Sequence, residues 1–152
     1  MGIRIRKFRV SDSEKVSQLI LKIFYEDNLK DVSEEGKDFF QNSHTPEHIK
    51  ENWRNTYSII AEENRKIVGI ARGKKDGWKS NLFVDGKYRN RRIAIRLLRK
   101  IEEWQKRVGN NIVYLNSSPF ALKFYERQDY KRKGRKKNYH GIPLYYMEKE
   151  IN

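Results

Sequence analysis

The sequence has no cysteine, which excludes disulfide bonds, thiolate metal ligands and a cysteine nucleophile. It also has no apolar run near the ~20 residues that a membrane-spanning helix needs. Residues 3–6 alternate apolar and basic side chains, unlike the apolar centre of a signal peptide. The three histidines are scattered and give no metal-ligand spacing. We therefore expect a cytoplasmic protein that binds neither a membrane nor a metal ion.

Acidic residues are outnumbered, since 20 Asp and Glu face 34 Lys and Arg, for a formal net charge of +14. Such an excess attracts polyanions and speeds their encounter with the protein. Nucleic acid, a phosphorylated cofactor and an acidic surface all fit this charge, as does a soluble lysine-rich surface. The excess is densest at residues 131–137, where six of seven side chains are basic. With tyrosines on either side, this run is either a nucleic-acid contact or a solvated loop.

Hydrophobic periodicity divides the 152 residues into strands and helices, with no linker or repeat that would separate domains. Strands are predicted at 3–8, 57–61, 66–72, 78–84, 112–116, 129–138 and 143–151. Helices are predicted after a capping box at 11–14, at 33–41, from Thr45 onward, at 92–108 and at 119–127. A three-strand meander followed by a β-α-β-α unit indicates one α/β domain over residues 1–152, with a mixed sheet and helices on both faces.

The most informative segment is residues 81–107, in which a short apolar strand, a turn, a basic loop and an amphipathic helix follow one another. The first N–H groups of a helix have no partner inside the helix, and the helix dipole adds partial positive charge there. The loop before this helix carries four cations, Lys87, Arg89, Arg91 and Arg92. We therefore expect a polyanionic ligand at the helix start.

Two segments carry a resemblance to a known family. Residues 89–94, Arg-Asn-Arg-Arg-Ile-Ala, stand directly after the fourth predicted strand and are similar to the loop pattern Gln/Arg-x-x-Gly-x-Gly/Ala. Residues 115–130 are similar to the motif Asn-x-Ser-Pro-x-Ala-x-x-x-Tyr-Glu-x-x-Gly-Phe. Both are motifs of the GNAT N-acetyltransferases, and the chain resembles their small, single-domain bacterial and archaeal members.

Arg92 and Asp129 depart from the family pattern, which usually has glycine at both positions. Arg92 fits the loop only if its φ is ordinary and its side chain swings aside or joins the phosphates. Asp129 tolerates left-handed backbone better than most residues do, so we expect its turn to survive.

The resemblance implies a GNAT fold of the α+β type, with a mostly antiparallel central sheet of about seven strands. Strands four and five would splay apart to admit the pantetheine arm of acetyl-CoA, the co-substrate, and no metal is implied. The acetyl group would pass to a primary amine by direct attack in a ternary complex. Many relatives pair, so a homodimer is one expected assembly. The residues that the resemblance places against the cofactor are Phe83, Val84, Arg89, Asn90, Arg91, Arg92, Ile93, Ala94, Asn116 and Ser118.

The resemblance places the hydroxyl of Tyr125 at the sulfur of CoA, where it would act as general acid. The alternative is a core tyrosine with a satisfied hydroxyl, since the chain has nine tyrosines. The general base stays open. Residues 79–81 of the fourth strand are Lys, Ser and Asn, and we interpret none of them as a competent base. The other candidates are Glu34, Glu35, Asp38, His44, His48 and Glu62.

Two other functions fit the same residues. One is a basic GNAT-like module without catalysis that binds nucleic acid through 131–137, which the arginine at position 92 favours. The other is an acetyltransferase whose acceptor is attached to RNA or to a ribosomal protein. The acceptor amine, on a small molecule or on a protein, depends on residues 25–56 and the last hairpin, where relatives differ most.

Overall fold

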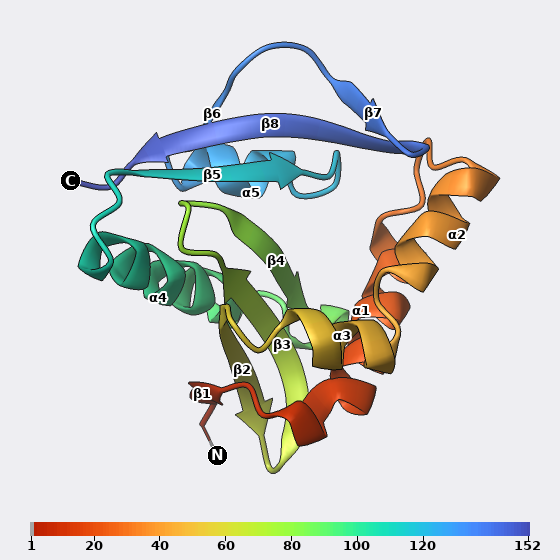
Figure 1. Ribbon diagram of the computed structural model, residues 1–152, viewed down its shortest axis with the longest axis vertical. Helices are drawn as coiled ribbons and strands as arrows, with labels where there is room; N and C mark the ends of the chain where they lie inside the picture. Colours follow the sequence, from red (N-terminus) through yellow and green to blue (C-terminus); the bar gives the residue numbers. More distant parts are fainter. Residues whose placement is uncertain (1) are drawn as a thin grey trace.

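Over residues 2–152, which the computed structural model describes, the chain forms eight strands and five α-helices (Figure 1). The strands are β1 (Arg4–Lys7), β2 (Tyr57–Glu63), β3 (Lys66–Gly73), β4 (Lys79–Val84), β5 (Ile112–Ser117), β6 (Lys131–Arg132), β7 (Lys137–Tyr139) and β8 (Ile142–Glu150). The helices are α1 (Ser13–Asp27), α2 (Glu34–Asn42), α3 (Pro46–Asn52), α4 (Ile93–Arg107) and α5 (Leu122–Arg127). Short 3-10 helices at Val10–Asp12 and Gly86–Tyr88 lie before α1 and α4.

The strands form two four-stranded sheets rather than one sheet of about seven strands. In the first, β1, β2, β3 and β4 lie side by side and pair antiparallel. In the second, β8 pairs antiparallel with β5, β6 and β7. The additional strand arises because the run predicted at 129–138 is interrupted around Gly134, whose φ is +83°. The predicted α+β class, with mostly antiparallel pairing and helices on both faces, is confirmed.

Within residues 2–152 the two sheets are joined by a single parallel bridge, between Trp78 and Tyr114. The Tyr114 N–H donates a hydrogen bond to the Gly77 carbonyl at 3.0 Å in the same place. Beyond this bridge β4 and β5 separate, which is the splay predicted for the fourth and fifth strands (Figure 1).

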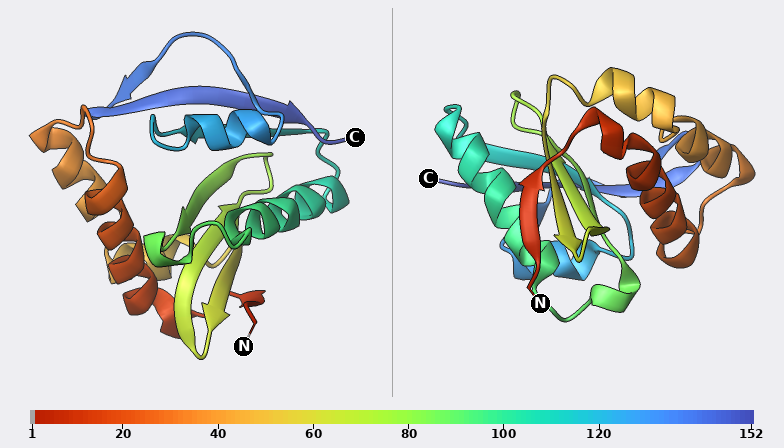
Figure 2. Two further views of the ribbon diagram at one scale, coloured as in Figure 1. Left: turned by 180° about the vertical axis from the view of Figure 1, so that it is seen from behind. Right: turned by 90° about the horizontal axis from the view of Figure 1, so that it is seen from below.

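Helices cover both faces of the first sheet (Figure 2). Successive strand residues point to opposite faces. Ile60 and Ile70 pack with α1 and α3 on one face, whereas Ile59 and Ala71 pack with α4 on the other. A third apolar cluster lies between α4, α5 and the second sheet, where Leu98 of α4 contributes. The helix α4 is therefore shared by the cores of both sheets.

The helix starts follow the predicted capping chemistry at α2 and α3 but not at α1. Ser33 and Thr45 cap their helices with side-chain oxygens. The capping box predicted at 11–14 is wrong. The carboxylate of Asp12 instead accepts a hydrogen bond from the Arg9 N–H at 2.7 Å and pairs with an arginine of β1. The chain before α1 is thus held by Asp12, through one local bond and one ion pair with β1, and not by Ser11 and Glu14.

The start of α2 docks on the turn between β7 and β8 (Figure 1). The Ser33 N–H donates to the Gly141 carbonyl at 3.0 Å, and Phe39 stacks on His140 with ring centroids 4.1 Å apart. Gly36 permits this approach, because a Cβ there would lie 2.6 Å from the Gly141 carbonyl oxygen. The contact holds α2 in place as a wall of the cleft between the sheets.

We predict that Gly36→Ala lowers the free energy of unfolding by about 1–3 kcal/mol, because its Cβ would overlap the turn at Gly141. Alanine's higher helix propensity acts in the opposite direction by ~1 kcal/mol, so a net loss identifies the overlap. Urea unfolding followed by circular dichroism measures the change. Gly2→Ala is the control, because a Cβ there meets nothing within 4 Å. A Gly36→Ala protein as stable as the wild type would contradict the close docking of α2.

Candidate active site

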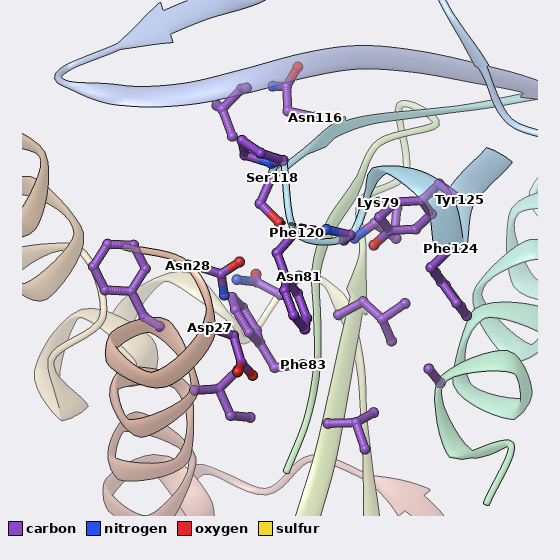
Figure 3. A pocket seen from close by; sticks show the side chains of 18 of the residues that line it. Asp27, Asn28, Lys79, Asn81, Phe83, Asn116, Ser118, Phe120, Phe124 and Tyr125 are labelled. Carbon is purple, nitrogen blue, oxygen red and sulfur yellow. Dashed lines mark hydrogen bonds between the residues drawn. The ribbon is translucent and has the colours of Figure 1, made fainter. Parts of the chain in front are cut away.

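A cleft of about 1290 Å³ opens where β4 and β5 separate, and both sheets contribute to its walls. Figure 3 shows side chains from the end of α1, from β4, from β5 and from α5 converging on it. Of the predicted site residues, all but Arg91 line this cleft; they are Tyr125, Phe83, Val84, Arg89, Asn90, Arg92, Ile93, Ala94, Asn116 and Ser118. Residues far apart in the sequence are thus brought together around one cavity.

A β-bulge at Ser80 directs β4 away from β5. In the pairing of β3 with β4, Gly73 lies opposite Lys79 and Arg72 lies opposite Asn81, so Ser80 is an extra residue on β4. Bulges bend and twist the strand that carries them. In the described chain, β5 makes no ladder with β4 beyond the bridge. The edge of β4 that faces β5 is therefore open to an extended ligand with amide groups.

The start of α4 presents free backbone donors to the cleft. No side chain among residues 2–152 caps this helix, so the N–H groups of Ile93, Ala94 and Ile95 are left without a partner in the chain. All three residues line the cleft. Their free N–H groups, together with the positive end of the helix dipole, make this a suitable place for a phosphate or diphosphate.

Arg92 does not have the ordinary φ that its fit to the loop was predicted to require. Its φ is +60° and its ψ is +19°, in the left-handed region that glycine adopts without strain. Left-handed backbone costs a residue with a side chain about 1–2 kcal/mol. The loop thus keeps a glycine-like path despite the arginine, whose side chain lines the cleft. Asp129 is also left-handed, with φ +71°, and the prediction that its turn survives is confirmed.

Two loop arginines are bound to carboxylates of the chain. Arg91 binds Glu63 at 2.6 Å and does not line the cleft, so its side chain is not placed to reach a ligand there. Arg89 pairs with Asp27, and its guanidinium carbon lies 5.0 Å from the ring centroid of Phe120. The pair between Arg89 and Asp27 connects the loop before α4 to the end of α1, and both residues line the cleft.

Tyr125 lies on α5 and lines the cleft, with 3% of its surface exposed. Its carbonyl accepts a hydrogen bond from the Tyr130 N–H at 3.0 Å, which fixes the end of α5. No group within residues 2–152 hydrogen-bonds its hydroxyl, whereas the hydroxyl of Tyr130 binds Glu102 at 2.7 Å. Tyr125 therefore lacks the satisfied hydroxyl of a core tyrosine. Burial raises the pKa of Tyr125, so its hydroxyl keeps its proton at neutral pH.

Lys79 is a site residue whose role was not predicted from the sequence. It is 4% exposed, and its Nζ lies 5.0 Å from the ring centroid of Tyr125 (Figure 3). Burial lowers the pKa of Lys79 to about 7, because the charged form loses its hydration. An amine that titrates there can exchange a proton at neutral pH, so Lys79 joins His44 as a titratable group of the cleft, and the interpretation that residues 79–81 hold no competent base stays a prediction. No local sequence pattern indicates this burial, because it follows from the pairing of Lys79 with Gly73 across two strands.

Among the general-base candidates, His44 alone lines the cleft in the described part of the chain. Its Nδ1 lies 2.8 Å from the Phe40 carbonyl oxygen, so Nδ1 carries the hydrogen. Its Nε2 then accepts a hydrogen bond from the Asn81 side-chain amide at 3.4 Å. Burial lowers the pKa of His44 to about 4, which keeps the imidazole neutral and makes it a weak base.

Two further features of the described chain concern ligands and membranes. No group of histidine, aspartate and glutamate side chains in residues 2–152 is arranged to hold a metal ion. In the same residues, every helix is too short or too polar to cross a bilayer.

Comparison with known proteins gives a match over most of the chain. A family model described as an acetyltransferase (GNAT) domain matches residues 28–151. The fold is similar to that of a GCN5-related N-acetyltransferase from Rhodopseudomonas palustris. That likeness has a TM-score of 0.88 at 18% identity and covers 99% of this chain and 97% of that one. A comparison with curated protein sequences gives no match.

Two other similar structures contain coenzyme A. One is the PaiA N-acetyltransferase from Thermoplasma acidophilum, with a TM-score of 0.82 at 18% identity over 99% of each chain. The other is an aminoglycoside 6'-N-acetyltransferase, with a TM-score of 0.69 at 16% identity over 98% of this chain and 97% of that one. At these identities the likeness concerns the fold.

We predict that Lys79→Met stabilises the protein near pH 7 and that this gain fades as the pH rises toward 10.5. The pKa of Lys79 is about 7 in the fold, against an ordinary value of 10.5. Wild-type stability therefore rises with pH across this window, since the unfolded chain binds the extra proton. The gain at neutral pH is on the order of 2–5 kcal/mol.

Urea unfolding at several pH values between 6 and 10 measures this gain. Lys75→Met, a change at an exposed lysine of the β3–β4 hairpin, is the matched control and should show no such pH trend. A Lys79→Met gain that stays constant from pH 7 to pH 10 would contradict a buried amine that titrates near neutrality.

Proposed function

Because the chain belongs to the GNAT family of acetyltransferases, we propose that it transfers the acetyl group of acetyl-CoA to a primary amine by direct attack in a ternary complex. Family membership makes the chain an acyltransferase, and the proposal adds the type of acceptor and the order of events. The observation that carries it is the cleft, where an open strand edge, an uncapped helix start and the free hydroxyl of Tyr125 meet.

The residues that line the cleft fit acetyl-CoA. The N–H groups of residues 93–95 would hold the diphosphate, with the guanidinium of Arg92 beside them. The open edge of β4 at Phe83 and Val84 would pair with the amides of the pantetheine arm, while Asn116 and Ser118 form the facing wall. The two similar structures that contain coenzyme A support this use.

Bound acetyl-CoA supplies an acetyl group that is already activated as a thioester. The chain therefore has to hold the acyl carbon beside the acceptor amine and exclude competing water, which is catalysis by positioning. The main-chain N–H of Val84 is suited to polarise the acyl oxygen, because it alternates with groups that bond to β3 and that edge of β4 has no β5 partner in the described chain.

We assign the proton for the departing sulfur to the hydroxyl of Tyr125. Its raised pKa keeps the proton in place until negative charge develops nearby. Lys79, whose Nζ lies 5.0 Å from the centroid of the same ring, places positive charge beside the phenolate that this transfer leaves, and the phenolate takes its proton back from solvent. His44 is too weakly basic to deprotonate an ammonium group, so the acceptor amine arrives neutral or loses its proton to water.

Residues 131–137 favour a second function, contact with nucleic acid. All seven residues are exposed, and six are cations. In the described chain the run makes one weak ion pair, between Lys136 and Asp31 at 3.8 Å. The remaining cations can neutralise phosphates, and Tyr139, 53% exposed, offers a ring for stacking. Such a contact is compatible with acetyl transfer, because Lys137 lies at the rim of the cleft.

We predict that Tyr125→Phe lowers kcat by roughly 100-fold or more, because the ring packing is kept while the proton donor is lost. Thiol release from acetyl-CoA with a panel of primary amines measures the rate, and the shift in melting temperature with acetyl-CoA should stay unchanged. Tyr25→Phe, at an exposed tyrosine outside the cleft, is the control. Equal turnover by Tyr125→Phe and the wild type from pH 6 to pH 9 would remove this hydroxyl from the reaction.

A further inference from the structure

One part of the cleft is lined by α1, α2, Trp78, β4 and the β7–β8 hairpin. We call this part the acceptor side. Its surface is largely aromatic; the rings belong to Phe24, Phe39, Phe40, Trp78, Tyr139 and Tyr146. Trp78 and Tyr146 form an aromatic shelf, with ring centroids 5.8 Å apart. A surface of this kind suits a ligand with an apolar or aromatic body.

Each ring of the aromatic shelf has a lysine residue as a neighbour. The Nζ of Lys137 is 5.4 Å from the ring centroid of Tyr146. Lys74 lies opposite Trp78 in the β3–β4 hairpin, since its main-chain N–H donates to the Trp78 carbonyl at 2.8 Å. Both lysines line the cleft and are exposed, so their charges are available to a ligand. An anionic group on a molecule that lies on the shelf would meet a lysine residue beside either ring.

Negative charge is nearly absent from the same surface. Within residues 2–152, Asp27 is the one carboxylate that lines the cleft, and Arg89 already pairs with it. A polycationic acceptor would bring several ammonium groups close to Lys74, Lys79 and Lys137 with no carboxylate to compensate them. Charges of one sign repel each other at short range, and salt screens this repulsion less in a partly buried cleft than at an exposed surface. The lining therefore discriminates against polycations.

An unpaired hydrogen-bond acceptor lines the cleft at the end of α1. The Oδ1 of Asn28 is buried without a partner in the described chain, and Asn28 lines the cleft. Figure 3 shows it on the same side as Asn81 of β4. Buried polar atoms are normally hydrogen-bonded, so an unpaired oxygen in a cleft marks a place for a donor. An amine N–H is such a donor.

We propose that the acceptor is a primary amine on an apolar or aromatic body that also carries one acidic group, a carboxylate or a phosphate. This inference rests on the proposed function. The aromatic shelf would hold the body, Lys137 or Lys74 the acidic group, and Asn28 the amine. The aminoglycoside acetyltransferase described above shares the fold at 16% identity, and aminoglycosides are polycations that this lining disfavours.

Matched pairs of amines test the proposal. Tyrosine is compared with tyramine, which lacks only the carboxylate, and tyramine O-phosphate is the phosphate arm. Spermidine and kanamycin represent polycations. Thiol release from acetyl-CoA gives kcat/KM for each amine. We expect at least one acidic amine to exceed tyramine by about tenfold or more, mainly through a lower KM, and to lose that advantage at high salt. If tyrosine has the higher kcat/KM, the acidic group is a carboxylate; if tyramine O-phosphate has the higher value, it is a phosphate.

Charge reversal on the shelf sharpens the test. Lys137→Glu should lower kcat/KM for the acidic amine by about tenfold and raise it for tyramine and spermidine. Lys133→Glu is the control, because it removes a cation from the same basic run at a residue that does not line the cleft. The ratio of kcat/KM for the acidic amine to kcat/KM for tyramine should stay as in the wild type.

The outcomes separate the two proposals. If acetyl-CoA raises the melting temperature but tyramine or spermidine is used as well as the acidic amines or better, the acceptor class is wrong and acetyl transfer stands. The acceptor class is also wrong if acetyl-CoA binds and no acidic amine is acetylated, or if Lys137→Glu leaves the preference unchanged. If acetyl-CoA does not bind at millimolar concentration, the proposed function fails and the acceptor class fails with it.

Discussion

The parting of β4 from β5 beyond the bridge of Trp78 with Tyr114 is the constraint on which the site depends. Strands that separate leave main-chain groups without partners, and such groups need water or a ligand. The bulge at Ser80 produces this separation close to the floor of the cleft, and the uncapped start of α4 adds further donors along its side. We therefore assign recognition of the ligand mainly to main-chain N–H groups. The identity of the side chain at position 92 then matters less than its left-handed backbone, which the arginine adopts as a glycine would.

A buried polar network joins the second sheet to α4. The carboxylate of Glu102 on α4 accepts hydrogen bonds from Tyr130 at 2.7 Å, from Lys149 of β8 at 3.0 Å and from Arg99 at 2.8 Å. A buried carboxylate with several donors is well satisfied, whereas the loss of one partner leaves an uncompensated charge. Because α4 also fills the core of the first sheet, this network ties both halves of the site to one helix.

The features that the sequence could predict are those that depend on residues close together in the chain. Apolar spacing located α4 and the strands around it, and the side chain of Thr45 located the start of α3, because capping needs only neighbouring residues. The ion pair of Arg91 with Glu63 joins residues 28 positions apart, and no local pattern encodes it. Lysines are almost always exposed, so the burial of Lys79 ran against the usual rule. The φ of Arg92 is likewise set by the loop around it rather than by its own preference.

We assign binding of the CoA diphosphate to main-chain N–H groups at the start of α4. Amide NMR of the labelled protein tests this assignment most directly, during titration with CoA and, separately, with pantetheine, which lacks the diphosphate. We expect CoA to shift the amide signals of Ile93, Ala94 and Ile95, and pantetheine to leave them in place. Both ligands should shift the amide of Val84 on the open edge of β4. Saturating CoA that leaves the three α4 amides unmoved would contradict the assignment of this helix start as the phosphate site.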